Sequence, residues 1–268
     1  MTQPAPSPGT RLKDKVILVT GSTTGIGEAI ARLFVREGAG VMIHGRRRDA
    51  AEAIAAELGE RAAFAVGDLE DPAVPARLIE ATVERFGRID GLVNNAARIV
   101  RDDLETGTAE RFDRIIAANL RAPLLLIQAA LPHFRKQGGG RVLNIGSVNA
   151  YCGESNLLFY AISKGGLVTL TRNLANTYAS EGIQFNQLNV GWTLTPNEYQ
   201  YKLKDGLPPD WPSKLPFEAA PSGRIHTPAE VAMAAIYFLS DEAALINGSI
   251  LDVEQFPLIG RISTKKGK

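Results

Sequence analysis

The stretch FYAISK, residues 159–164, places a tyrosine and a lysine one helical turn apart. Side chains four positions apart on a helix are neighbours, so Tyr160 and Lys164 would share one face. In a site closed to water, a lysine ammonium stabilises a nearby phenolate, which suits the pair to proton exchange with a substrate oxygen. An unperturbed tyrosine titrates near pH 10, so about 4 kcal/mol of phenolate stabilisation would bring it near neutrality. The same spacing also fits two amphipathic side chains on an ordinary helix face.

A second candidate for chemistry is the glycine-rich stretch TGSTTGIG, residues 20–27. Gly21, Gly25 and Gly27 follow a G-x-x-x-G-x-G spacing directly after an apolar run. Glycines allow a sharp turn and a close approach of backbone N–H groups to a pyrophosphate, and the following helix N-terminus adds free donors. An ordinary glycine-rich turn is the alternative. The position between a first strand and a first helix favours a dinucleotide site.

The second apolar run ends in HGRRRD, and this end bears on the choice of cofactor. In dinucleotide folds an acid roughly twenty residues beyond the glycines binds the ribose hydroxyls. Arg46 stands there instead, followed by Arg47. Since an arginine can pair bidentately with a 2′-phosphate, the sequence favours NADP(H), with NAD(H) as the alternative. Asp49 could still bind the ribose if the turn is longer.

Apolar runs alternate with amphipathic helical patterns along almost the whole chain. Nearly all-apolar strands separated by helices indicate a parallel sheet that is covered on both faces. The sequence therefore predicts an α/β fold, a Rossmann-type doubly wound sheet of about seven strands in three α/β/α layers. Strands are expected at 15–20, 40–45, 62–68, 90–96, 141–147, 183–190 and 249–254, and helices at about 25–38, 48–58, 72–86, 108–117, 119–136, 157–181 and 228–240.

The chain reads as one dinucleotide-binding and catalytic domain over residues 11–260. Residues 1–10 are expected to be a flexible arm and 261–268 a basic tail. The stretch 192–227 breaks the alternation with six prolines and two tryptophans. A long irregular connection in a compact domain is usually a lid or binding loop, so we expect it to be a substrate loop.

Composition excludes several classes of protein. The chain has 268 residues, 45% hydrophobic residues and a formal net charge of +1, which is unlike a disordered chain or a nucleic-acid binder. The single cysteine, Cys152, excludes a disulfide framework, and three scattered histidines offer no metal cluster. No signal peptide and no window approaching eighteen uninterrupted apolar residues is present. We expect a cytoplasmic protein with a small-molecule substrate and no nucleic-acid or membrane partner.

Taken together, TGSTTGIG, NNAA at 94–97, Asn119, Ser147 and YAISK resemble the short-chain dehydrogenase/reductase family in order and spacing. The resemblance covers about residues 12–253 and implies an NAD(P)(H)-dependent oxidoreductase that acts on CH–OH groups. Tyr160 then resembles the family's general acid/base, and Lys164 the group that lowers its pKa and bonds the nicotinamide ribose. Ser147 resembles the donor to the substrate oxygen. Asn119 resembles the residue that keeps a proton-relay water.

The resemblance also implies a set of cofactor contacts. Asp68 resembles the aspartate beside the adenine, Asn94 the asparagine that steadies the central sheet, and Thr193 the contact to the nicotinamide carboxamide. Together with the catalytic Tyr160 and Lys164, the expected cofactor-binding residues are Gly21, Ser22, Thr24, Gly25, Ile26, Gly27, Arg46, Arg47, Asp68, Leu69, Asn95, Ala96, Gly191 and Thr193.

Three departures from the family pattern stand out. Ala97 replaces the usual glycine of NNAG, which is tolerable if the backbone angles suit alanine. Val190 stands where many members have proline, which makes the place of Thr193 less certain. The end of the chain reads LDVEQFPLIGR instead of an acidic-Gly-Gly finish, and the residues there that could reach a pocket or a subunit contact are Phe256, Pro257 and Arg261.

The expected substrate wall is polar. It combines Ser147 and Tyr160 with Asn149, Glu154, Asn156, Phe159, Trp192 and Asn197. Amides and a carboxylate suit a sugar, a polyol or another polar substrate, including a lactol. Alternatively, these groups cap the helix near 157, for which Asn156 is a good N-cap candidate.

Other functions compete with this hypothesis. One is reduction of a bulkier apolar or aryl ketone or a 3-oxoacyl substrate, and another is a catalytically silent cofactor-binding sensor. A serine hydrolase is disfavoured because no G-x-S-x-G elbow accompanies Ser147. The resemblance further implies a homotetramer, or a homodimer, through the helices at 108–136 and 157–181.

Overall fold

The computed structural model describes residues 9–217 and 219–256. The predicted arm up to residue 8, the basic tail, Pro257 and Arg261 lie outside the described residues.

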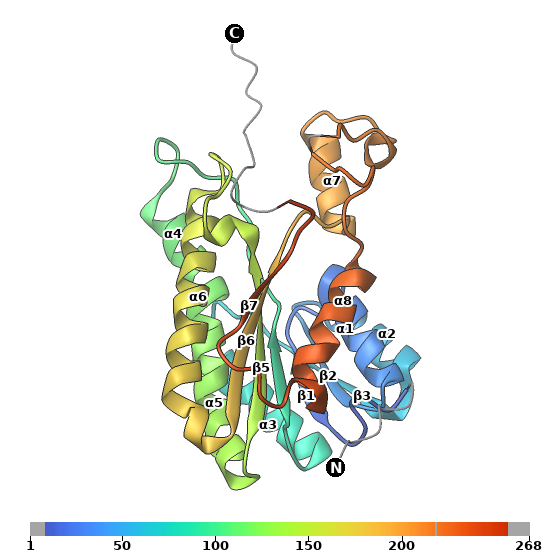
Figure 1. The fold of residues 1–268 in the computed structure, drawn as a ribbon, viewed down its shortest axis with the longest axis vertical. Helices are drawn as coiled ribbons and strands as arrows, with labels where there is room; N and C mark the ends of the chain where they lie inside the picture. Colours follow the sequence, from blue (N-terminus) through green and yellow to red (C-terminus); the bar gives the residue numbers. More distant parts are fainter. Residues whose placement is uncertain (1–8, 218, 257–268) are drawn as a thin grey trace.

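Strands and helices follow one another almost as the apolar patterns predict (Figure 1). Each predicted strand is present, and only its ends differ by a few residues. The strands are β1 (Val16–Val19), β2 (Gly40–Gly45), β3 (Ala62–Val66), β4 (Gly91–Asn94), β5 (Gly140–Ser147), β6 (Ile183–Val190) and β7 (Ile250–Val253). The helices are α1 (Gly25–Arg36), α2 (Arg48–Leu58), α3 (Val74–Phe86), α4 (Ala109–Ile116), α5 (Ala122–Lys136), α6 (Leu158–Tyr178), α7 (Pro196–Lys204) and α8 (Pro228–Leu239).

The seven strands form one parallel sheet in the order β3-β2-β1-β4-β5-β6-β7. The order reverses between β1 and β4, so the chain winds outward in both directions from the middle. In open parallel sheets, ligands bind beyond the carboxyl ends of the strands at this switch point. The predicted Rossmann-type sheet is therefore confirmed, and its topology puts the glycine-rich turn after β1 next to the end of β4.

Two apolar layers hold the helices to the sheet. α1, α2 and α8 cover one face, with Ile30, Phe34 and Ile236 among the buried residues. α3, α5 and α6 cover the other face around Leu78, Phe134 and neighbouring residues. Figure 1 shows α5 and α6 on one side of the sheet and α1, α2 and α8 on the other. Burial on both faces explains why β1 and the other central strands read as continuous apolar runs.

A chain of polar side chains, buried from Asn94 to Asn189 and exposed at Asp252 and Tyr151, crosses the sheet from β4 to β7. Asn94 on β4 donates to the Oδ1 atom of Asn144 on β5 at 2.8 Å, and Asn144 donates to Thr171 on α6 at 2.9 Å. The chain then continues through Gln187, Asn189, Asp252 and Tyr151. These bonds tie β4 to β5 and β6 to β7, although the buried Oδ1 atom of Asn94 has no hydrogen-bond partner among the described residues. The role of Asn94 in steadying the sheet thus has a structural basis.

Two predicted elements differ in the structure. The helices expected at 108–117 and 119–136 form one run from α4 to α5, joined by a π-helical turn at Ala117–Arg121. This run, Ala109–Lys136, is long and apolar enough to cross a membrane by length and composition alone. Half of its most apolar window is buried in the fold, as expected of a core helix.

The stretch 192–227 is more regular than its prolines suggest. It contains α7 and a short 3-10 turn at Trp211–Ser213, and it has its own apolar cluster around Trp211, Ala220 and Ile225. Pro196 does not prevent α7, because proline is tolerated in the first turn, where its missing N–H is not needed. In Figure 1 this segment stands above α8 and α1.

Candidate active site

The catalytic candidates gather where β5 meets α6. Ser147 is the last residue of β5, and Tyr160 and Lys164 lie in the first two turns of α6. All three side chains are buried, with 6%, 8% and 3% of their surface exposed. The predicted helix therefore exists, and Tyr160 and Lys164 face the sheet rather than solvent. This excludes the alternative that they are two amphipathic side chains on an exposed helix face.

Ser147 is oriented as a hydrogen-bond donor. Its Oγ atom accepts the backbone N–H of Asn149 at 3.2 Å, which leaves the hydroxyl proton for another partner. The hydroxyl of Ser147 also hydrogen-bonds to the phenol of Tyr160. A serine and a tyrosine hydroxyl thus converge on one point beyond the carboxyl end of β5, where a substrate oxygen could replace their mutual contact.

Burial dominates the titration of Tyr160. It raises the pKa of the phenol to about 12, against the opposing effect of the Ser147 hydrogen bond, and the negative charge of Glu198 raises the pKa further. The sequence predicted that Lys164 would lower the pKa of this phenol. The structure gives the opposite net direction for the chain by itself, because desolvation penalises the phenolate more than its surroundings stabilise it.

Lys164 is close to the phenol but points to the backbone. Its Nζ atom donates to the carbonyl of Ile145 at 2.7 Å and lies 5.6 Å from the centre of the Tyr160 ring. Burial lowers the pKa of the ammonium to about 8. The lysine is therefore a proton donor whose charge is labile near neutrality, held beside the ring by one carbonyl.

Asn119 lies in the π-helical turn between α4 and α5. Its Oδ1 atom accepts the N–H of Arg98 at 2.7 Å, and its Nδ2 atom donates to the Arg98 carbonyl and to Ser163 Oγ, both at 3.0 Å. Ser163 in turn donates to the carbonyl of Tyr160 at 2.7 Å. π-turns recur at functional sites, and here the extra residue brings Asn119 against α6. Its side chain is occupied by protein groups, so the relay water stays a prediction.

Ser163 is a supporting residue that the sequence analysis missed. It is fully buried one position before Lys164 and links Asn119 to the backbone of Tyr160. Ser163 lies three residues after Tyr160 and therefore on the same face of the helix, and this spacing could have indicated a buried hydroxyl.

The glycine-rich turn is packed tightly against the end of β4. Gly21 has a φ of +63°, and a Cβ there would lie 2.9 Å from the Cα of Ala96. Asn95 pins the turn by donating from Nδ2 to the carbonyls of Thr20 and Gly21. A Cβ at Gly27 would collide with the Asn95 amide. These positions require glycine, and the motif's spacing is explained by the close packing of the turn.

The turn leaves the start of α1 open to an anion. Thr24 occupies the N-cap position but makes no side-chain cap, so the N–H groups of Gly25 and Ile26 remain available. A helix N-terminus with free donors favours a phosphate group. Ser22 departs from the prediction in one respect, because its hydroxyl points inward, donating to the Val19 carbonyl and accepting from the His44 N–H.

His44 is a second supporting residue that the sequence analysis passed over. Its Nδ1 atom accepts the Gly21 N–H at 3.2 Å, which leaves the proton on Nε2 to bond the Gly67 carbonyl at 3.2 Å. Burial lowers the pKa of the imidazole to about 4. A neutral histidine on β2 thus joins the glycine-rich turn to the end of β3, beside Asp68.

Three charged residues surround the expected adenosine position. Arg46 and Arg47 follow β2 immediately, are exposed, and form no ion pair with other described residues. Asp49 is the second residue of α2, so the turn after β2 is short. This weakens the alternative that Asp49 binds the ribose. Asp68 follows β3, is exposed, and accepts the Glu70 N–H at 3.0 Å, with Leu69 buried beside it.

The segment after β6 closes over the glycine-rich turn. Thr193 is buried and donates to the Gly191 carbonyl at 3.1 Å. Thr195 approaches Gly25, where a Cβ would lie 3.3 Å from its methyl group. A Cβ at Gly191 would collide with the Glu254 carboxylate. The chain therefore turns over the strand ends even with Val190 in place of proline, and Thr193 lies beside the carboxyl end of β6.

The departure at Ala97 is harmless. Among the described residues other than glycine, only Asp14 has a positive φ, so Ala97 is outside the left-handed region. The condition that the sequence analysis set for tolerating alanine is met.

The predicted substrate residues separate into two groups. Asn149 and Trp192 are half-buried near the carboxyl ends of β5 and β6, whereas Glu154 and Asn197 are exposed. Asn156 does not cap α6: Leu157 occupies the N-cap position, without a side-chain bond, and the Asn156 carbonyl accepts from Asp102 instead.

Phe159 is held by aromatic packing. It packs edge-on against Phe112 with ring centres 5.3 Å apart, and its ring also closes on Gly107. Its ring is thus anchored to the segment that leads into α4.

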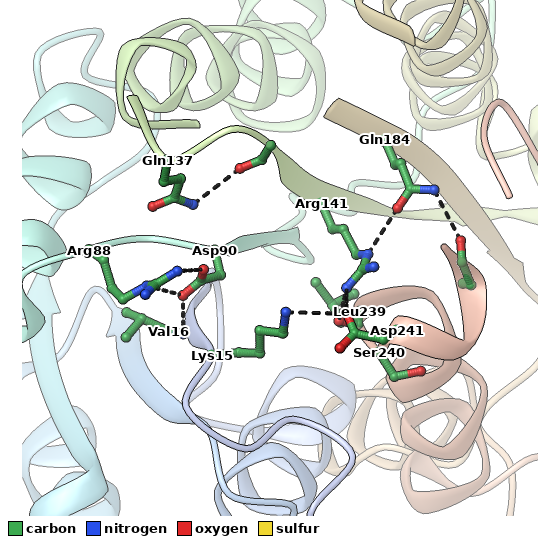
Figure 2. Close-up of polar contacts among 12 residues, drawn as sticks. Lys15, Val16, Arg88, Asp90, Gln137, Arg141, Gln184, Leu239, Ser240 and Asp241 are labelled. Atoms are coloured by element: carbon green, nitrogen blue, oxygen red, sulfur yellow. Dashed lines mark hydrogen bonds and ion pairs between the residues drawn. The ribbon is translucent and has the colours of Figure 1, made fainter. Parts of the chain in front are cut away.

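A polar hollow of about 260 Å³ lies at the other end of the sheet, around the first residues of β4 and β5. Figure 2 shows that its charged groups bind one another: Arg88 pairs with Asp90, while Lys15 and Arg141 pair with Asp241. Every charged group there has a partner, and the catalytic candidates lie at the opposite, carboxyl ends of the strands. The paired charges around this hollow therefore have a structural role at the amino ends of the strands.

Comparisons with known proteins agree with this geometry. A family model described as enoyl-(acyl carrier protein) reductase matches residues 21–255. The chain is 35% identical to levodione reductase of Leifsonia aquatica over 255 residues, covering 92% of this chain and 96% of the relative. It is 36% identical to D-threitol dehydrogenase of Mycolicibacterium smegmatis over 248 residues, covering 91% and 93%. A crystal structure of levodione reductase superposes with a TM-score of 0.84 at 33% identity, covering 91% of this chain and 97% of that one. The chain therefore belongs to the short-chain dehydrogenase/reductase family of oxidoreductases, whose members use nicotinamide cofactors to act on CH–OH groups.

Proposed function

We propose that this protein interconverts a secondary alcohol and a ketone, or a lactol and a lactone, on a small hydroxylated substrate with NADP(H) as the preferred cofactor. The observation that carries the reaction is the buried cluster of Ser147, Tyr160 and Lys164 beyond β5, at the same carboxyl ends of the strands as the open N-terminus of α1. It joins a proton-exchanging phenol to a site suited to a dinucleotide phosphate.

The nicotinamide ring supplies the hydride acceptor or donor when the cofactor is bound. The chain's own residues handle the proton and the oxygen. Ser147 donates to the substrate oxygen and holds it beside the phenol. Tyr160 gives its proton to that oxygen during reduction and takes it back during oxidation. Lys164 is proposed to bond the nicotinamide ribose, and its charge favours the phenolate when the site is closed to water.

Support for NADP(H) comes from the end of β2. Arg46 and Arg47 are exposed there without ion-pair partners in the described chain, and the nearest acid, Asp49, already belongs to α2. A guanidinium at this position can bind a 2′-phosphate bidentately. Asp68 and Leu69 are proposed to contact the adenine, and Gly191 and Thr193 the nicotinamide carboxamide.

Support for a polar substrate comes from the groups beyond the strand ends. Ser147 and Asn149 lie there, together with Trp192, whose indole N–H donates to Glu198, and one relative at 36% identity is named a D-threitol dehydrogenase. Reduction of a bulkier apolar ketone is the second candidate. It is favoured by the half-buried ring of Trp192, which stacks on Trp211 with centres 5.4 Å apart.

We further propose a homotetramer, or a homodimer, assembled through α4, α5 and α6, and residence in the cytoplasm. Exposed apolar side chains on this face, Leu124 and Ile162, support the assembly. The free, exposed thiol of Cys152 is compatible with a reducing compartment.

The test is steady-state kinetics on a panel of sugars, polyols and aryl ketones with NADP and with NAD. We expect the highest kcat/KM for a polyol or sugar with NADP. In an Arg46→Ala variant, the ratio of kcat/KM with NADP to kcat/KM with NAD should fall about tenfold or more. Tyr160→Phe should reduce kcat by about 10²- to 10⁴-fold. Unchanged turnover in Tyr160→Phe would contradict the reaction, and a clear NAD preference would contradict the cofactor assignment.

A further inference from the structure

Glu198 is a carboxylate near the site that neither the family resemblance nor the sequence analysis singled out. It lies in the first turn of α7, where Thr195 caps the helix by accepting the Glu198 N–H at 3.1 Å. The cap and the helix fix its backbone, so the side chain projects from a defined position over the strand ends. Only 27% of the side chain is exposed.

Trp192 orients this carboxylate. The indole Nε1 atom donates to Oε1 of Glu198 at 2.7 Å, and the indole itself is held by stacking on the buried Trp211. In the described chain, Oε2 accepts no hydrogen bond, so half of the carboxylate is available to a ligand. A rigid donor on one oxygen and a free second oxygen make a positioned hydrogen-bond acceptor.

Glu198 lies at the same end of the sheet as the catalytic candidates, in the segment that follows β6. Trp192 lies two residues beyond β6, the strand that pairs with Ser147 through its last residue, Val190. The negative charge of Glu198 also reaches the phenol, because it raises the pKa of Tyr160. A ligand whose reacting oxygen lies on Tyr160 would therefore extend toward Glu198.

The surroundings of Glu198 favour a neutral donor over a cation. The Lys202 ammonium lies 3.7 Å from Oε1 and 5.2 Å from the centre of the Trp192 ring. Asp205 pairs with Arg101 at 2.6 Å and lies 4.0 Å from the same Lys202 ammonium. Because the Lys202 ammonium already lies beside the carboxylate, a substrate ammonium would meet a like charge there, whereas a hydroxyl can still donate to Oε2.

We propose that Glu198 is a specificity-determining residue that accepts a hydrogen bond from a substrate hydroxyl next to the reacting carbinol. The substrate class is thereby narrowed to neutral diols, polyols and sugars that carry a second hydroxyl adjacent to the oxidised one. The proposal rests on the proposed function, since it assumes that the alcohol oxygen binds at Tyr160.

The test compares Glu198→Gln with the parent enzyme on two probes, butane-2,3-diol and butan-2-ol, each oxidised with NADP and with NAD. Glutamine keeps an oxygen acceptor for the Trp192 indole, so α7 should stay in place. We expect the ratio of kcat/KM for the diol to that for the mono-alcohol to fall about tenfold to a hundredfold, mainly through KM. The pH profile of oxidation should also move to lower pH in the variant, because a negative charge near Tyr160 is removed.

Asp205→Asn is the matched control, because it removes one carboxylate at the far end of α7. It should leave the diol preference at the parent value. A ratio that stays within about twofold of the parent in Glu198→Gln would overturn the assignment of Glu198 and leave the proposed function standing. A selective loss for 3-aminobutan-2-ol instead of the diol would also overturn it, in favour of a cationic substrate. Parent enzyme that oxidises neither probe nor any panel alcohol would refute the proposed function itself.

Discussion

Lys164 is a charged group that the fold buries at a cost. Its ammonium is 3% exposed and its bond to the Ile145 carbonyl recovers only part of the lost hydration, so burial lowers its pKa to about 8. The folded protein holds this proton less tightly than the unfolded chain does. Burial of Lys164 therefore destabilises the fold at low pH, and this penalty disappears as the pH rises from about 8 toward 10.5. The buried charge of Lys164 therefore lowers the stability of the cofactor-free protein, and a bound cofactor would have to offset that loss.

Replacing Lys164 by methionine should stabilise the cofactor-free protein while abolishing catalysis. At pH 7 we expect a gain of about 1–3 kcal/mol in the free energy of unfolding, because a buried charge is exchanged for an apolar side chain of similar length. The gain over the parent should shrink above pH 8, where the parent lysine loses its proton. Urea unfolding at pH 7 and pH 9.5 checks this, and a variant less stable than the parent at pH 7 would contradict it.

His44 predicts that the stability of the protein falls at acidic pH. Its folded pKa, about 4, is below the ordinary value of 6.5, so the unfolded chain takes up the proton first as the pH falls. The stability due to neutral His44 is complete above pH 6.5 and is lost toward pH 4; about 2 kcal/mol should be gone at pH 5.

A His44→Gln variant tests this contribution. It should lose less stability than the parent between pH 7.5 and pH 5 in urea unfolding, by about 2 kcal/mol. Because the Gly21 contact is altered, its KM for the cofactor should also rise. His133→Gln, a change on α5 away from the turn, is the control, and a His44→Gln slope equal to that of the parent would show that the histidine does not stay neutral.

At the scale of elements, the described residues of 192–227 form a small folded unit with its own apolar core. Trp211 is 2% exposed and stacks between Trp192 and Tyr199, away from the two large core layers. A satellite cluster of this kind can open without the rest of the fold. The orientation of Glu198 depends on it, since Trp192 is held by the Trp211 ring.

Trp211→Ala should therefore loosen this unit selectively. We expect faster proteolytic cleavage within 192–227 and a higher substrate KM. Loss of a tryptophan from a main core costs roughly 3–5 kcal/mol, and the fall in melting temperature should be smaller than that cost would produce. Limited proteolysis followed by mass spectrometry locates the cleavage. Phe217→Ala removes a ring that is 72% exposed in the same segment and should behave like the parent. Equal cleavage of the two variants would argue against a separate core.

At the scale of the whole molecule, the sheet order brings distant segments to one edge. The turn after β1, the ends of β2 and β3, and the segment after β6 meet there, because all strands are parallel and the winding reverses between β1 and β4. The cofactor-binding candidates from Gly21 to Thr193 thus occupy one edge although they span most of the chain. The opposite edge is closed by the paired charges of Figure 2.

The proposed assembly makes a prediction at this scale. Leu124 on α5 and Ile162 on α6 are 44% and 46% exposed, and burying such side chains against another copy would remove apolar surface from water. Light scattering should give the mass of a tetramer or dimer. A double change, Leu124→Glu and Ile162→Glu, should shift it toward the 28.8 kDa monomer. A monomeric parent would refute the assembly.

The sequence by itself determined the strands, most helices and the glycine-rich turn, and it named the residues that the fold gathers after β5. These features are written locally, in apolar periodicity and in short motifs, and neighbours in the chain remain neighbours in the fold. Local patterns also misplaced the helix break near residue 118 and the order within 192–227. A π-turn and a proline-led helix depend on packing against α6 and on the Trp211 cluster.

Only the tertiary structure decided the electrostatics and the supporting contacts. The sequence predicted a lowered pKa for Tyr160, but burial raises it to about 12, because desolvation depends on everything packed around the phenol. His44 and Glu198 were passed over for the same reason. Their partners are Gly67, which follows β3, and Trp192, which lies beyond β6. How the chain folds over the strand ends sets these contacts.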